Sequence, residues 1–84
     1  MSNKTTQQQI KLEPEEVLFL YKNCNASIKS VVFERLKKQG YNYTKLLITK
    51  EVSKLKREYN PVIIAEIRAV LKENLDLEFN PKNN

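Results

Sequence analysis

The sequence predicts an all-α protein, a small bundle of four short helices. Apolar residues recur at spacings of three and four along most of the chain, and Pro14 and Pro61 stand where helices would begin. The single glycine, Gly40, stands two residues after Lys37-Lys38, at an expected helix end. The 84 residues suit one domain with a modest core. We expect a single helical domain at residues 12–79, a flexible polar arm at residues 1–11 and a flexible tail at residues 80–84.

The first expected helix begins near Pro14 and runs to about Lys22. Proline fits a first helical turn, and Glu15 and Glu16 suit the positive end of the helix dipole. The following run, residues 17–21, is apolar on every side, so it is expected to be buried all round or to share one face with a second chain in a homodimer. The candidate contact residues are Val17, Leu18, Phe19, Leu20 and Tyr21.

The second expected helix has Asn25 or Ser27 as its cap and ends at Gly40, which suits the position just after a helix. One apolar stripe runs along it: Ile28, Val31, Val32 and Leu36. The sequence leaves residues 41–48 open. They fit a short helical turn capped by Asn42 or Thr44, or a turn followed by an extended stretch.

The third expected helix covers residues 49–59, with Thr49 as its cap. Its expected core residues recur at spacings of four, three and four: Ile48, Val52, Leu55 and Tyr59. At about 100° per residue, three cations lie on the opposite side, roughly 160° away: Lys50, Lys54 and Arg57. The pattern predicts a helix with core on one face and positive charge on the other.

The fourth expected helix begins at Asn60 and Pro61, a cap followed by proline in the first turn, and Asn74 can end it. Its apolar residues form a broad buried face: Ile63, Ile64, Ile67, Val70 and Leu71. Leu75, Leu77 and Phe79 then alternate with acids. This pattern fits either a short edge strand or an extended segment laid across the core.

The chain contains no histidine, one cysteine and one glycine. These counts argue against histidine-based catalysis, common zinc sites and glycine-rich phosphate loops, so we expect a non-enzymatic protein with no catalytic, cofactor-binding or metal site. Cys24 is expected to be a small, partly buried residue at a helix end. The N-terminus lacks an apolar signal region and no apolar run approaches membrane-spanning length, which predicts a soluble intracellular protein of the cytoplasm, nucleoid or nucleus.

Positive charge is concentrated in the middle of the chain. Residues 22–57 contain ten Lys or Arg and two acids, a local charge of +8, whereas the whole chain carries +5. A polarised charge map indicates an anionic partner, and nucleic acid is the first candidate. Membrane-surface binding is not expected, because Ile48, Val52 and Leu55 are assigned to the core.

Several of these features together resemble a λ-repressor/Cro-type helix-turn-helix domain over about residues 25–75. The second helix ends at Gly40, a basic helix follows, and Asn60-Pro61 opens a helix to Leu71. The resemblance implies that Thr49, Lys50, Ser53 and Lys54 face the major groove, and that Lys45 and Arg57 hold the DNA backbone.

These observations predict a small DNA-binding transcriptional regulator. RNA is a less favoured variant, suggested by Tyr41 and Tyr43 beside lysines, which suit stacking on unpaired bases. The alternative is a protein-interaction module, an inhibitor or adaptor that docks on an acidic partner surface.

Overall fold

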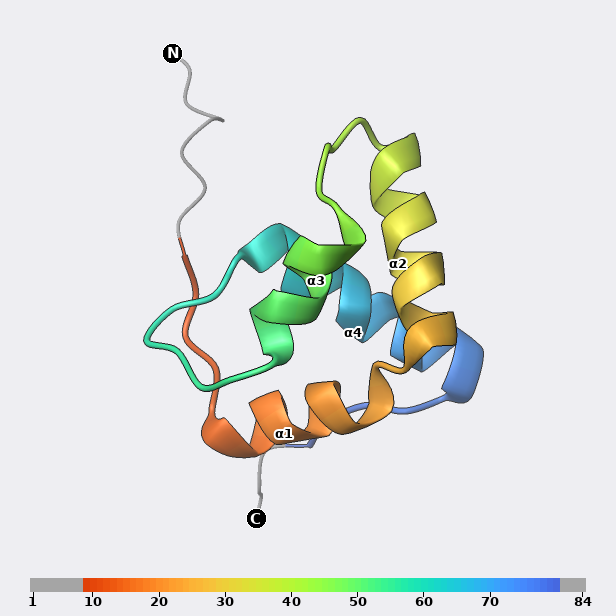
Figure 1. Cartoon of the computed structure of the whole chain (residues 1–84). Coiled ribbons are helices and arrows are strands. Elements are labelled where there is room, and N and C mark those ends of the chain that lie inside the picture. Colours follow the sequence, from red (N-terminus) through yellow and green to blue (C-terminus); the bar gives the residue numbers. More distant parts are fainter. Residues whose placement is uncertain (1–8, 81–84) are drawn as a thin grey trace.

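Four α-helices and their connections form the part of the chain that the computed structural model describes, residues 9–80 (Figure 1). In chain order they are α1 (Pro14–Asn23), α2 (Ala26–Lys38), α3 (Lys45–Val52) and α4 (Pro61–Leu75). The all-α prediction is confirmed. Most of the predicted polar arm and tail, residues 1–8 and 81–84, lies outside the described residues. None of the described helices is long and apolar enough to cross a membrane.

Helix α1 has Pro14 in its first turn, as predicted, and its last turn is closed by the Cys24 N–H, which donates to Leu20 O. Val17 and Leu20 are buried in the core, whereas Leu18 and Tyr21 are exposed. The helix is therefore not buried all round, and its apolar run divides into a core side and a solvent side.

Helix α2 begins at the predicted cap, where the Ile28 N–H donates to Asn25 Oδ1 over 2.9 Å. Ile28, Val32 and Leu36 are buried along one stripe. After the helix, Gly40 takes a φ of 96°, a conformation that L side chains rarely adopt. The only glycine of the sequence therefore stands at the backbone position that needs one.

Helix α3 differs from the prediction. It begins at Lys45, after Thr44, whose Oγ1 accepts from the Leu47 N–H over 3.1 Å, and it ends at Val52 rather than at residue 59. The open segment 41–48 thus supplies the first half of this helix, and the cap alternative with Thr44 is confirmed.

In the loop of residues 53–59, side chains form hydrogen bonds with several backbone groups. The Tyr59 hydroxyl accepts from the Lys56 N–H over 2.7 Å and donates to Lys54 O over 3.4 Å, and Ser53 Oγ donates to Lys50 O. Tyr59 is buried, as predicted, but Leu55 is exposed. The assignment of Leu55 to the core is wrong.

Helix α4 is the central helix of the bundle, and α2 packs along it most extensively (Figure 1). Asn60 Oδ1 accepts from the N–H groups of Val62 and Ile63, which confirms the predicted cap. All five predicted apolar residues are buried: Ile63, Ile64, Ile67, Val70 and Leu71. The helix continues one residue beyond Asn74, to Leu75.

The segment after α4 is extended and is not a strand. Asp76 adopts the left-handed conformation with a φ of 56°, and the Leu77 N–H donates back to Leu71 O. This turn directs the chain toward α1, where the rings of Phe79 and Phe19 lie 5.7 Å apart. The one strand-like pairing among residues 9–80 is a single antiparallel bridge between Ile10 and Tyr59. Ile10 also packs against the hydrophobic core.

Two sets of ion pairs connect α4 to the other helices. Arg35 of α2 contacts Glu66 and Glu73, and Arg68 contacts Glu16 of α1. Glu66 is only 9% exposed, and its carboxylate contacts both Arg35 and Gln39 of α2 and its cap.

Candidate nucleic-acid interface

Most cations of the central segment have no acidic partner within the described residues. Among residues 9–80, only Arg35, Lys56, Arg68 and Lys72 take part in ion pairs. Within residues 22–57, eight cations remain without one: Lys22, Lys29, Lys37, Lys38, Lys45, Lys50, Lys54 and Arg57. We call the five that lie on α3, beside it or in the loop that follows it the basic surface: Lys37, Lys45, Lys50, Lys54 and Arg57.

The acids are distributed in the opposite way. Residues 22–57 hold only two acids: Glu34, which has no ion pair with any residue of 9–80, and Glu51, which pairs with Lys56 over 3.0 Å. Glu16, Glu66, Glu73, Asp76 and Glu78 pair with cations of α2 or α4. The pairing therefore leaves the positive excess of the central segment unneutralised.

Lys45 is the first residue of α3, and its side chain is directed toward α2. Its Nζ lies 5.4 Å from the centre of the Phe33 ring, and Lys37 Nζ lies 6.0 Å from the same ring. The aromatic face attracts both ammonium groups. Phe33 is therefore a shared neighbour of Lys37 and Lys45 at the seam between α2 and α3.

The other predicted contact residues lie at the far end of α3 and beyond it. Thr49 is half-buried, Lys50 is exposed in the last turn, and Ser53 caps the helix. Lys54 and Arg57 are exposed in the loop of residues 53–59. The prediction of a positive stripe along one helix is therefore wrong, because α3 ends at Val52, before Lys54 and Arg57.

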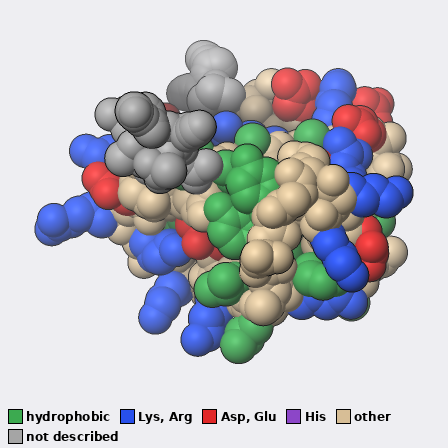
Figure 2. Space-filling model, turned by 90° about the horizontal axis from the view of Figure 1, so that it is seen from above, with side chains coloured by type: hydrophobic (Ala, Val, Ile, Leu, Met, Phe, Trp, Pro, Cys, Tyr) green, Lys and Arg blue, Asp and Glu red, His purple; other side chains and the backbone are tan. Residues whose placement is uncertain are grey.

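The site consequently has two parts. Lys45 and Lys50 are five positions apart on α3, so their side chains leave the helix about 140° apart around its axis. Lys37 and Lys45 form one part, at the α2–α3 seam, and Lys50, Lys54 and Arg57 form the other, at the end of α3. Figure 2 shows one face of the molecule, with hydrophobic side chains in its middle and Lys and Arg side chains around its edge, where several Asp and Glu side chains also stand.

Three exposed leucines share the second part of the site. Leu46 is 62% exposed, Leu47 is 47% exposed and Leu55 is 61% exposed. The sequence reasoning missed them as surface residues, since Leu46 and Leu47 fell in the segment left open and Leu55 was assigned to the core. The signal that would have found them is the Thr44 cap, because a helix starting at Lys45 turns Leu46 away from Ile48 and Val52.

Tyr41 and Tyr43 stack on each other, with ring centres 5.4 Å apart and ring planes 11° apart. Both are half-buried against the core, and the Tyr43 hydroxyl accepts from Asn60 Nδ2 over 3.2 Å. The pair connects the α2–α3 loop to the start of α4. This position favours a structural role for the two rings over a platform for unpaired bases.

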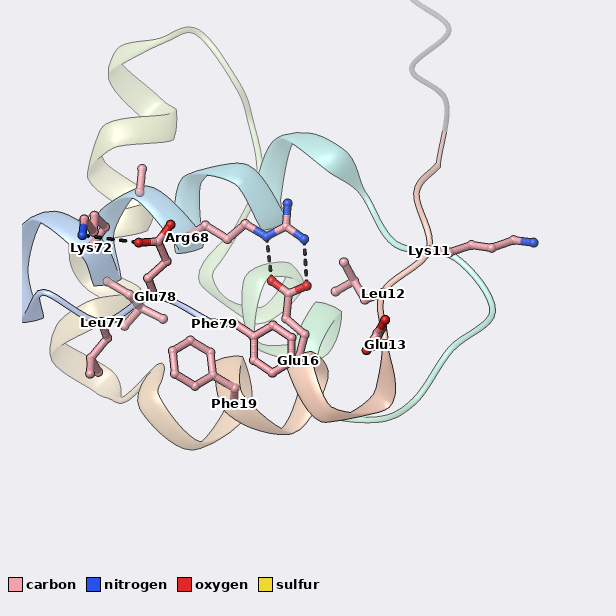
Figure 3. Close-up of a pocket in the computed structure, with 12 residues that line it drawn as sticks. Lys11, Leu12, Glu13, Glu16, Phe19, Arg68, Lys72, Leu77, Glu78 and Phe79 are labelled. Carbon is pink, nitrogen blue, oxygen red and sulfur yellow. Dashed lines mark hydrogen bonds and ion pairs between the residues drawn. The ribbon is translucent and has the colours of Figure 1, made fainter. Parts of the chain in front are cut away.

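A pocket of about 520 Å³ lies elsewhere, between α1, α4 and the extended segments that precede α1 and follow α4 (Figure 3). Glu16 and Arg68 form two hydrogen bonds across it, of 2.7 and 2.9 Å, and Phe19 and Phe79 lie beside each other at its edge. Three cations and three acids line it: Lys11, Arg68, Lys72, Glu13, Glu16 and Glu78. The lining is thus balanced in charge and does not extend the basic surface.

The pKa values of Cys24 and Glu73 are shifted by their surroundings. Burial raises the pKa of the Cys24 thiol, which is enclosed at the end of α1 as predicted. The hydrogen bond from Arg35 lowers the pKa of Glu73. Within residues 9–80, no group of three His, Cys, Asp or Glu is arranged to hold a metal ion. Neither Cys24 nor Glu73 lies in the basic surface.

Comparison with known proteins gives no relative: no family model, curated protein or solved structure matches this chain. The helix-turn-helix resemblance therefore stays a prediction. In the structure one helix, α3, stands between Gly40 and Asn60, where that family has two.

Proposed function

We propose that this protein binds duplex nucleic acid, DNA in preference to RNA, through the basic surface, and acts as a small transcriptional regulator in the nucleoid or nucleus. One observation carries the proposal: eight cations of residues 22–57 have no ion-pair partner within the described part of the chain.

The physical basis is release of counterions from DNA. Each lysine or arginine that neutralises a phosphate frees condensed cations, and binding then weakens as salt rises. Exposed side chains such as Lys50, Lys54 and Arg57 can reach phosphates without first breaking an ion pair with another residue of 9–80. The end of α3 and the following loop form the proposed contact.

The test is the salt dependence of binding to a short DNA duplex. We expect the affinity of the unaltered protein to fall steeply with salt, and the variant with Lys50→Ala and Lys54→Ala to lose about two units of the log–log slope. The matched control carries Lys11→Ala and Lys72→Ala, the same change in charge at the pocket, and should keep the original slope.

Two results would refute the proposal. In one, the unaltered protein does not bind duplex DNA at low salt. In the other, the control double variant changes the slope as much as the double variant at Lys50 and Lys54, which would mean that binding follows net charge and not this surface.

A second candidate function is docking on an acidic protein partner. It is favoured by Leu46 and Leu55, which are exposed beside the cations and which phosphate contacts do not use. A variant with Leu46→Ala and Leu55→Ala distinguishes the two functions. It should bind DNA like the unaltered protein if DNA is the partner, and should lose binding to an acidic protein if such a protein is.

A further inference from the structure

The side of α3 that faces away from the core combines leucine with lysine. The buried residues Ile48 and Val52 mark the side of the helix that faces the core. At about 100° per residue, Lys50 points about 180° away from the middle of that side, with Leu46 and Leu47 about 40° and 60° to either side of it. All three side chains are exposed. The outermost side of α3 is therefore two leucines around one lysine.

The loop after α3 repeats this combination. Residues 53–58 are all exposed, and the loop swings out from the bundle beyond the end of α3 (Figure 1). Leu55 is 61% exposed and has cations on both sides along the chain: Lys54, Lys56 and Arg57. Lys56 connects the loop to the helix, because its Nζ lies 3.0 Å from Glu51 Oε1 of α3. We call the leucines and the cations without an ion pair on these two neighbouring segments the leucine–cation surface: Leu46, Leu47, Lys50, Lys54, Leu55 and Arg57.

A partner of this surface must accept both kinds of side chain. The phosphates of a DNA backbone bind cations but give leucine no apolar contact. The surface of an anionic membrane carries phosphate groups directly above acyl chains. Leucine side chains can enter the boundary of the acyl region, while the long stems of lysine and arginine keep their charges at the level of the phosphates.

We infer that the leucine–cation surface binds anionic membranes, with its leucines in the interface and its cations on lipid phosphates. Charge complementarity supports this partner, because residues 45–58 contain five cations and two acids, and one of these acids, Glu51, is already paired with Lys56. The sequence argued against membrane-surface binding partly because Leu55 was assigned to the core. The exposure of Leu55 removes that reason.

This inference goes beyond nucleic-acid binding and does not rest on it, because membrane binding is measured with no DNA present. The two partners would share Lys50, Lys54 and Arg57, so a DNA duplex should displace the protein from anionic vesicles. The leucines distinguish the two partners, since membrane binding needs them and phosphate contact with DNA does not.

The first test uses tryptophan as a reporter, since the chain contains none. Leu55→Trp places it in the loop, and the matched control Leu75→Trp places it at another exposed leucine, at the end of α4. With vesicles of phosphatidylcholine and phosphatidylglycerol, at about 0.1 M salt, we expect the emission of Leu55→Trp to shift to shorter wavelength and that of Leu75→Trp to stay as in water. Vesicles of phosphatidylcholine alone should leave both spectra unchanged.

The second test is co-sedimentation with the same anionic vesicles. A variant with Leu46→Ala and Leu55→Ala should bind about tenfold or more weakly than the unaltered protein, because it buries less apolar surface in the interface. The matched control carries Leu18→Ala and Leu75→Ala, the same change at exposed leucines of α1 and α4, and should bind like the unaltered protein. All four leucines are exposed, so both variants should keep the helical circular dichroism spectrum.

Three results would overturn the inference. The unaltered protein may fail to sediment with anionic vesicles, which would assign the exposed leucines to a protein partner instead. The emission of Leu55→Trp may stay unchanged on these vesicles, or the variant at Leu46 and Leu55 may bind as tightly as its control. Either of the last two results would mean that cations alone adsorb to the charged surface and that no leucine enters it.

Discussion

Gly40 is the residue at which backbone conformation matters most. Its φ of 96° lies in a region that side chains disfavour, and a Cβ added there would meet no atom within 4 Å. Gly40→Ala is therefore expected to lower the free energy of unfolding by about 1 kcal/mol, through the backbone alone. Urea denaturation measures the change. An unaltered midpoint would show that the loop after α2 can relax at no cost.

Asp76 gives the opposite expectation, because a residue with a side chain occupies a left-handed position there. Asp76→Gly should raise the free energy of unfolding, measured by urea denaturation, by about 0.5 kcal/mol or more. The substitution also removes the ion pair between Lys72 Nζ and Asp76 Oδ1, 3.4 Å apart, which contributes little because both side chains are exposed. A destabilised Asp76→Gly protein would mean that this surface pair outweighs the backbone effect.

Tyr59 holds the loop after α3 by its hydroxyl group. Tyr59→Phe removes both hydrogen bonds, with Lys56 N–H and Lys54 O, and should cost about 1–2 kcal/mol of unfolding free energy. Tyr21→Phe is the matched control, because Tyr21 is exposed and has no hydrogen bond from its hydroxyl within the described residues. Equal effects of the two substitutions on the melting temperature would contradict this account of the loop.

At the scale of helices, the sequence predicted α1, α2 and α4 well because each has a start signal before its apolar residues, although α2 had two candidate caps, Asn25 and Ser27. Pro14 and the Asn60-Pro61 pair stand directly before apolar residues at helical spacing, and Asn25 has one stripe after it. For α3, Thr49 was predicted as the cap because a periodicity continued from there to Tyr59, and Thr44 was offered only as one of two caps for a separate short turn. The structure places the cap of the helix at Thr44.

The periodicity was misleading because Tyr59 is buried for a reason other than a helix. The Tyr59 N–H donates to Ile10 O over 2.7 Å, and Tyr59 O accepts from the Ile10 N–H over 2.9 Å. Such a pairing joins two residues that are far apart in the sequence. Local spacing carries no information about a pairing of this kind, so the loop of residues 53–59 and the exposure of Leu55 could not be predicted.

Helices α2 and α4 are joined by an acid-sensitive pair. Arg35 lowers the pKa of Glu73, so this carboxylate stabilises the fold above its unfolded pKa, about 4.3, and the contribution is lost as pH falls through the lower folded value. We expect the melting temperature of Glu73→Gln to fall less between pH 7 and pH 3 than that of the unaltered protein. Glu34→Gln, at an exposed acid without an ion pair among residues 9–80, should keep the original pH dependence, and identical profiles for all three proteins would contradict the assignment.

At the scale of the whole molecule, the sequence shows the positive charge of the central segment, but it does not show which of those cations form ion pairs with acids. Arg35 meets Glu73 and Arg68 meets Glu16 across 38 and 52 positions of sequence. These long-range pairs decide which cations already have an acidic partner. Within the described residues they leave Lys50, Lys54 and Arg57 free of ion pairs, so the predicted contact residues keep their charge even though the predicted helix does not hold them.

The central claim, that duplex DNA contacts the basic surface, is tested most directly by NMR titration of the protein with a short DNA duplex at low salt. We predict that the amide shifts are concentrated in residues 45–57, with smaller shifts near Lys37, and that they disappear at high salt. Shifts confined to Leu18 and Tyr21, shifts at the pocket, or none at all would contradict the claim.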